Sequence, residues 1–308
     1  MNQYLSDFET WAQNEDKGRK TITTYRSVMT KFIQWYEVTT GTEFRPADVT
    51  PVLLQDFRSH MQTVEHAKPS TINKDLSILK VFFTWALDAG HTRINPAAKI
   101  KMIRTQQSHA PKWMDDNQVH RLLYAVEGQR NDWKRLRDLA IVHVMLDAGL
   151  RVEETSELKI SHINMKSEIV EVMRGKRNKH RSVPMTRELK RVLRAWINVR
   201  SDNAKPAHQT SDYLFVSERA GHMTVRGINH MLDGHLALAG LLDRATDGRK
   251  ENSFSCHSLR HTFCKNLVNN GWSIQNVARV AGHESIQTTM RYVEPSQDEL
   301  KKAMQAIR

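Results

Sequence analysis

Apolar residues recur at helical spacing through the first 90 or so residues of the chain. The stripes predict four helices, over residues 2–14, 21–36, 51–64 and 70–90. Thr50 before Pro51 is a predicted cap for the third helix, and Ser70 is a predicted cap for the fourth. Four helices joined by short links predict a compact all-α unit.

After Asn95-Pro96 the chain loses this periodicity and becomes basic and polar. We therefore expect a helical domain over residues 1–104, a basic linker over 105–112, and a second domain over 113–308. A linker of this charge could follow a phosphate backbone, and a plain solvated hinge explains it equally well. The sequence leaves both readings open.

The second half of the chain mixes two periodicities. Alternation over residues 169–173 and 181–185 predicts two strands joined by a basic turn. Around these strands, helical spacing predicts helices over residues 115–126, 133–148, 186–200, 224–240, 257–268 and about 296–308. Residues 243–253 are predicted to form a loop. Fold class is therefore mainly α with a small β-sheet.

The composition narrows the class of partner. The chain of 308 residues carries a formal charge of +12, which suits a polyanion, nucleic acid first. Its two cysteines, Cys256 and Cys264, lie on one predicted helix and cannot bridge each other there, which favours a reducing cytoplasm. The N-terminus is not typical of a signal peptide, and the longest apolar run is too short for a membrane span.

Candidate chemistry lies near the C-terminus. His257 and Arg260 are three residues apart and share a helix face, where an imidazole and a guanidinium suit a phosphate. Such a pair alone occurs by chance in many proteins. Here Gly282-His283 follows, and Tyr292, a possible nucleophile toward phosphorus, comes nine residues later.

These segments resemble a known family. "HSLRHTFCKNLVNNG" and "AGHESIQTTMRYV" are similar to the two C-terminal boxes of the tyrosine recombinase (phage integrase) family. Gly149-Leu150-Arg151, followed three residues later by Glu154, resembles the family's first box, and "MRGKRNKHRSVPM" resembles its β-hairpin. The likeness covers about residues 149–293, and the four N-terminal helices resemble the SAM-like core-binding domain in general shape.

The resemblance implies a complete catalytic set. Its members are Arg151, Lys176, His257, Arg260, His283 and Tyr292. Tyr292 would be the nucleophile, Lys176 the general acid with Lys179 as a rival, and Glu154 a support for Arg151. Further contacts to DNA phosphates are expected from the basic turn and the strand after it: Arg174, Arg177, Lys179 and Arg181.

Neither a metal nor ATP is required by the implied chemistry, because a 3′-phosphotyrosyl bond keeps the energy of the DNA ester. A zinc site at His257 and His261 is disfavoured, because Ser258 stands where a hydrolase helix would carry Glu. We expect His261 to have a packing or phosphate-side role. No cofactor is expected.

The resemblance implies a site-specific DNA recombinase, an integrase or resolvase of a mobile element, acting through a Holliday junction. Expected partners are double-stranded DNA at short core sites, a homotetramer joined by the C-terminal helix, and possible accessory DNA-bending or element-encoded proteins. The two domains would form a C-shaped clamp on the duplex. Two alternatives stay open: a type IB topoisomerase-like enzyme, and a non-catalytic DNA-binding regulator on the same fold.

Overall fold

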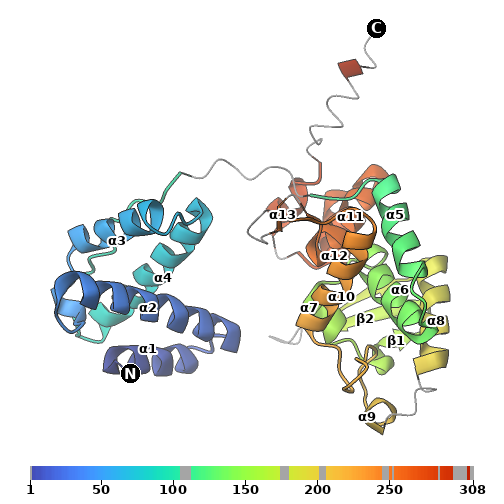
Figure 1. Ribbon diagram of the computed structural model, residues 1–308, viewed down its shortest axis with the longest axis horizontal. Coiled ribbons are helices and arrows are strands. Elements are labelled where there is room, and N and C mark those ends of the chain that lie inside the picture. Colours follow the sequence, from blue (N-terminus) through green and yellow to red (C-terminus); the bar gives the residue numbers. More distant parts are fainter. Residues whose placement is uncertain are drawn as a thin grey trace. The chain divides into compact units, whose positions relative to one another are not determined.

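The computed structural model describes residues 2–104, 112–173, 180–200, 206–244, 250–251, 253–283, 285–293 and 304–305. The chain divides into two compact units, Met1–Ser108 and His109–Arg308 (Figure 1). The predicted linker, apart from Lys112, and most of the predicted C-terminal helix lie outside the described residues. Over the described ranges, no helix is both long enough and apolar enough to span a membrane.

Helices make up the regular structure of the N-terminal unit. They are α1 (Gln3–Asn14), α2 (Arg19–Thr40), the 3-10 turn η1 (Pro46–Asp48), α3 (Pro51–Thr63) and α4 (Pro69–Asp88). Thr50 caps α3 as predicted, because its hydroxyl accepts the Leu53 N–H at 3.2 Å. The predicted cap at Ser70 is wrong. Lys68 is the N-cap and Pro69 takes the first helical position, where its fixed φ and missing N–H cost nothing.

Aromatic rings form the centre of this unit. Phe32 of α2 meets Phe57 of α3 with ring centroids 5.0 Å apart and planes at 70°, and Phe8 of α1 meets Phe82 of α4 edge-on at 5.2 Å. All four rings are completely buried. The predicted apolar stripes therefore pack against one another, which confirms the all-α prediction for residues 2–104.

The C-terminal unit contains the remaining elements. Its helices are α5 (Asp116–Glu127), α6 (Asp132–Leu146), α7 (Val152–Ser156), the 3-10 turn η2 (Ile160–His162), α8 (Arg187–Arg200), α9 (Pro206–Gln209), α10 (Val225–Leu238), α11 (Cys256–Asn269), α12 (Ile274–Ala281) and α13 (Ile286–Met290). Its strands are β1 (Ile163–Asn164), β2 (Ile169–Met173), β3 (His180–Pro184), β4 (Asp243–Arg244) and β5 (Lys250–Glu251).

The central element of this unit is α6. Every residue from Arg137 to Leu146 is buried, because α5, α8, α10 and α11 all contact this helix. Polar residues inside it are paired: Asp138 binds Arg137 at 2.8 Å and His235 of α10 at 3.0 Å. The helix ends directly before the Gly149-Leu150-Arg151 segment, so the core of the unit fixes the position of Arg151.

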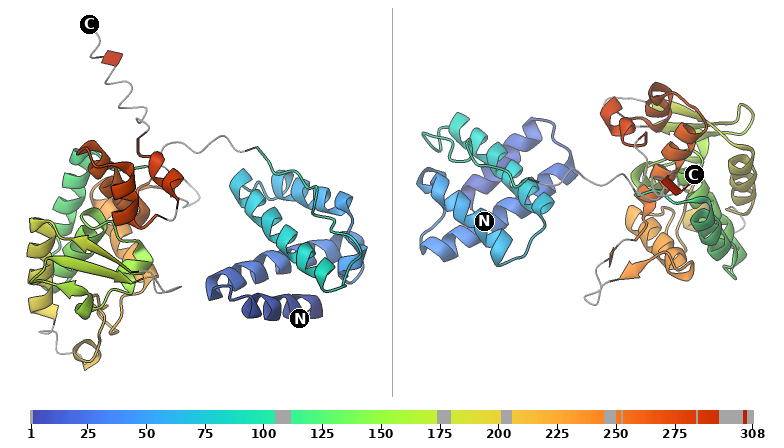
Figure 2. Two further views of the ribbon diagram at one scale, coloured as in Figure 1. Left: turned by 180° about the vertical axis from the view of Figure 1, so that it is seen from behind. Right: turned by 90° about the horizontal axis from the view of Figure 1, so that it is seen from above.

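Three antiparallel strands form the small sheet in the order β1-β2-β3 (Figure 2). Buried Val170 pairs with buried Val183, so the predicted alternation faces the core. The predicted loop over 243–253 is wrong in part, since β4 pairs with β5; strands of two residues are too short for alternation to reveal. Even so, the mainly α fold with a small sheet is confirmed.

Candidate active site

A tight turn brings Arg151 to the start of α7. Gly149 has φ +62, and a Cβ on it would lie 2.2 Å from Cδ1 of Phe263, so only glycine lets the chain pass this close to α11. Glu154, in the first turn of α7, accepts the Arg151 backbone N–H at 2.8 Å and its Nη1 at 3.0 Å. One carboxylate thus holds both the backbone and the side chain of Arg151.

Arg260 enters the same place from α11 and is only 1% exposed. Its Nη1 donates to the Gly149 carbonyl, and its Nη2 donates to the Ala281 carbonyl at 2.6 Å. Burial, with the positive charge of Arg151 nearby, lowers the pKa of Arg260 to about 10. The guanidinium therefore stays charged at neutral pH, and it joins the turn before α7 to the end of α12.

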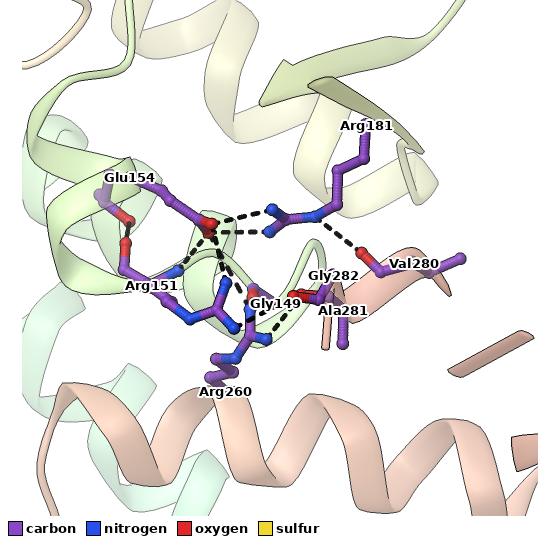
Figure 3. A network of polar contacts seen from close by, with 9 residues as sticks. Gly149, Arg151, Glu154, Arg181, Arg260, Val280, Ala281 and Gly282 are labelled. Carbon is purple, nitrogen blue, oxygen red and sulfur yellow. Dashed lines mark hydrogen bonds and ion pairs between the residues drawn. The ribbon is translucent and has the colours of Figure 1, made fainter. Parts of the chain in front are cut away.

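Three arginines converge on the last carbonyls of α12 (Figure 3). Arg181 donates to the Val280 carbonyl at 2.8 Å, Arg260 to that of Ala281, and Arg151 to that of Gly282 at 3.1 Å. Carbonyl oxygens at the C-terminal end of a helix lack intrahelical donors and carry partial negative charge, so cations are stabilised there. Arg151 and Arg260, predicted to act together, are brought together by this helix end.

Glu154 supplies the negative charge among these arginines. It binds Arg181 at 2.8 Å through both oxygens, binds Arg151, and lies 4.0 Å from Nη1 of Arg260. Burial acts to raise the pKa of Glu154, but the hydrogen bonds and charges of Arg181 and Arg151 outweigh it and lower that pKa to about 2. The carboxylate is therefore ionised under all working conditions.

Arg181, one of the expected DNA-phosphate contacts, lies on the inner side of the small sheet. Its side chain is 11% exposed, and three of its N–H groups are used by Glu154 and Val280. The sequence suggests a phosphate ligand because the residue follows a basic turn. The fold turns this side chain inward, because β3 lies against α12 and carries Arg181 on that side.

The two predicted histidines lie beside the arginines. His283 hydrogen-bonds Thr289 through Nδ1 at 2.8 Å, and its ring is nearly parallel to that of Tyr292, with centroids 6.1 Å apart. Burial and the neighbouring arginines lower the pKa of His283 to about 4, and the same causes lower the pKa of His257. Both imidazoles are thus mainly neutral at neutral pH.

Tyr292 is 1% exposed and packs between α11 and α12. Its hydroxyl hydrogen-bonds Nδ1 of His261, and the sulfur of Cys264 also contacts it. Nζ of Lys265 donates to the Tyr292 carbonyl at 3.4 Å. Burial raises the pKa of Tyr292 above its ordinary value, so the phenol is protonated in this arrangement.

His261 is the residue whose position the sequence did not predict. It lies one turn after His257 on α11, and the two rings meet edge-on with centroids 4.1 Å apart. Burial, His257 and Arg260 lower the pKa of His261 to about 3, so its imidazole is neutral. The sequence led us to expect a packing or phosphate-side role for His261, and its spacing from His257 gave no sign of a contact with Tyr292.

Lys176 and its rival Lys179 lie outside the described residues, as do Arg174 and Arg177. The strands on either side are described. Met173 of β2 pairs with His180 of β3, and Met173 lines a surface hollow together with Arg151, Lys159, His283 and Thr288. The exposed part of Arg151 therefore opens into a hollow that the hairpin borders.

Two family models match most of the chain. The phage integrase family matches residues 112–299, and the phage integrase N-terminal SAM-like domain matches residues 5–91. Tyrosine recombinase XerD of Pasteurella multocida is 31% identical over 296 residues, which span 95% of this chain and 93% of that one. TnP I resolvase of Bacillus thuringiensis is 25% identical over 301 residues, with 97% and 98% of the two chains covered.

Solved structures show the same fold. A Tn1549 transposon integrase in complex with a circular-intermediate DNA superposes with a TM-score of 0.75 at 17% identity, over 99% of each chain. A lambda integrase dimer bound to a core site gives 0.72 at 16% identity, over 96% of this chain and 95% of that one. With both domains matched and relatives aligned along almost their whole length, the chain belongs to the phage integrase family and is a site-specific recombinase of the tyrosine type.

Proposed function

We propose that the arginines at the end of α12, the neighbouring histidines and Tyr292 form a DNA strand-cleavage site. The observation that carries the proposal is the convergence of Arg151 and Arg260 on two consecutive carbonyls, with Tyr292 ten residues after Gly282. Two fixed guanidiniums can bind both non-bridging oxygens of a phosphodiester. They can also stabilise the extra negative charge of the transition state.

In the proposed reaction the Tyr292 oxygen forms a bond to phosphorus while the bond from phosphorus to the 5′-oxygen breaks. The phenol proton passes to the neutral imidazole of His261, against which His257 packs, and the 5′-oxygen takes a proton from Lys176. The product is a 3′-phosphotyrosyl ester and a free 5′-hydroxyl. A 5′-hydroxyl from a second duplex reverses the step, which exchanges strands and generates a Holliday junction.

Double-stranded DNA is the proposed partner, in keeping with the net charge of +12 and with DNA-bound structural relatives. We further propose that the helical unit and the catalytic unit grip one duplex as a C-shaped clamp in the bacterial cytoplasm. Four copies would assemble on two sites through their C-terminal segments. Since phosphate contacts would supply most of the affinity, binding should weaken steeply as salt rises.

A nicked suicide substrate tests the chemistry. Cleavage beside the nick releases a short strand, so the covalent complex cannot religate and accumulates as a slower band on a denaturing gel. We expect an adduct with the wild-type chain and none with Tyr292→Phe. An adduct that survives Tyr292→Phe, or no adduct on any duplex that the protein binds specifically, would remove the enzymatic proposal.

Strand exchange needs a second readout. Two duplexes of different length that share a binding site should yield joint products and Holliday junctions. Relaxation of supercoiled DNA without joint products would instead favour a topoisomerase-like enzyme, and specific binding without any adduct would favour a regulator.

A further inference from the structure

Arg181 occupies a position in the site that its sequence context did not suggest. It begins on β3 and ends between α7 and the last turn of α12, where it contacts segments 27 and 99 residues away in the chain. Figure 3 shows its guanidinium facing Glu154 with both terminal nitrogens. This parallel two-point contact, at 2.8 Å for each pair, is the strongest geometry available to an arginine and a carboxylate.

Arg181 is also closely packed against Gly282. A Cβ added to Gly282 would lie 3.0 Å from Nη1 and 3.1 Å from Cδ of Arg181, and Gly282 has φ +68. The glycine therefore both ends α12 and leaves room for the arginine. His283 follows directly, so the path of the backbone toward this histidine depends on the space that Arg181 fills.

Arg181 supplies part of the positive charge that balances Glu154. Oε1 of Glu154 accepts from both Arg151 and Arg181, and Oε2 accepts from the Arg151 backbone and from Arg181. Without Arg181, the cations that the structure describes beside the buried carboxylate would be Arg151 and, at 4.0 Å, Arg260. It would then attract those two guanidiniums more strongly, in competition with a bound phosphate.

We propose that Arg181 is a positioning residue for strand cleavage: it saturates Glu154 and fixes the turn at Gly282, so that Arg151 and His283 are held toward the scissile phosphate. This inference rests on the proposed function of the site. In this role Arg181 needs no contact of its own with the DNA. It acts through Glu154 and through the end of α12. The basic residues around it in the sequence do not predict this role.

Two measurements separate this role from that of a phosphate contact. The first is DNA affinity as a function of salt, and the second is the rate of covalent adduct formation on a nicked substrate at saturating protein. For Arg181→Gln we expect unchanged affinity and salt slope, with a rate about 10- to 100-fold lower, because small displacements of catalytic groups cost this much. Arg181→Lys, which keeps the charge but not the two-point contact, should recover part of the rate.

The matched control is Arg191→Gln, which removes another arginine–glutamate pair, with Glu188, on the exposed face of α8. It should change neither quantity. If Arg181 acts through Glu154, the double variant Arg181→Gln/Glu154→Gln should be about as slow as the slower of the two single variants, because both changes disturb the same support of Arg151. Rate losses that multiply in the double variant would contradict a route through Glu154.

Other outcomes overturn the proposal directly. If Arg181→Gln lowers the salt slope by about 0.9 and keeps the saturated rate, the residue is a phosphate ligand. If Arg181→Gln and Arg181→Lys both fail to unfold cooperatively, its role is structural only. Failure of the wild-type chain to form any adduct would instead count against the proposed function, so the two failures can be told apart.

Discussion

The hydroxyl of Tyr292 is hydrogen-bonded to Nδ1 of His261, thirty-one residues earlier in the chain. The tyrosine ring lies buried beside Cys264 and parallel to His283. Burial thus keeps the candidate nucleophile protonated, and a neutral imidazole is hydrogen-bonded to its hydroxyl. The reactivity of the phenol should depend on this histidine.

Substituting His261 should therefore slow cleavage without weakening DNA binding. We expect His261→Leu to lower the rate of adduct formation about 100-fold, the low end of what one acid–base group contributes. His261→Gln retains an acceptor and should lose less. Single-turnover cleavage at saturating protein measures the effect. Equal rates for the wild type and His261→Leu would show that the contact has no part in the reaction.

Arg260 and Arg151 should differ in what their loss does to stability. Arg260→Ala leaves the carbonyls of Gly149 and Ala281 buried without donors, and we expect it to cost about 2–5 kcal/mol in the free energy of unfolding. The side chain of Arg151 is 31% exposed and donates to one carbonyl, so Arg151→Ala should lower the free energy of unfolding by about 1–2 kcal/mol. Both variants should lose strand cleavage. Urea unfolding distinguishes them, and equal destabilisation would contradict the difference in burial.

Gly149→Ala should disrupt the turn that positions Arg151. The new methyl group would collide with the Phe263 ring at 2.2 Å in a backbone conformation that alanine avoids, so we expect destabilisation of about 2–4 kcal/mol. Gly234→Ala in α10 is the control, because a Cβ added there would meet no described atom within 4 Å apart from its neighbours in the same helix. In a helix interior that change should stabilise by about 0.5–1 kcal/mol. Thermal unfolding of both variants tests the pair.

Two half-buried histidines, His261 and His283, predict an acid limit to stability. The pKa values of His261 and His283 are lowered to about 3 and 4 in the folded chain, from 6.5. Below pH 6.5 the unfolded state therefore binds more protons, and the free energy of unfolding falls as pH falls. Each histidine accounts for at most about 2 kcal/mol between pH 6.5 and 5, less any screening by solvent.

Urea unfolding from pH 8 to pH 5, followed by hydrogen exchange of the α11 amides, measures this dependence. The double variant His261→Gln/His283→Gln should show a shallower decline than the wild type. His120→Gln, on the exposed side of α5, serves as the control and should leave the slope unchanged. An identical slope in the double variant would mean that other groups set the acid limit.

The sequence by itself determined the elements and the main chemical groups. Apolar spacing located the helices of the N-terminal unit, and the cap at Thr50 and the turn at Gly149 could be read from local chemistry. His257 and Arg260 were recognisable as partners because residues three apart share a helix face. These features depend on neighbours within one or two turns, so a single sequence contains what is needed to predict them.

Only the tertiary structure decided which of the polar groups meet. In the sequence, Arg181 is one of several basic residues of a hairpin, and only the fold shows that it contacts the end of α12. His261 was expected to have a packing or phosphate-side role, and only the fold shows its hydrogen bond to Tyr292. The reason is physical. The carbonyls at the end of α12 and the carboxylate of Glu154 attract any nearby guanidinium, and chain topology, which local periodicity does not encode, decides which arginines arrive there.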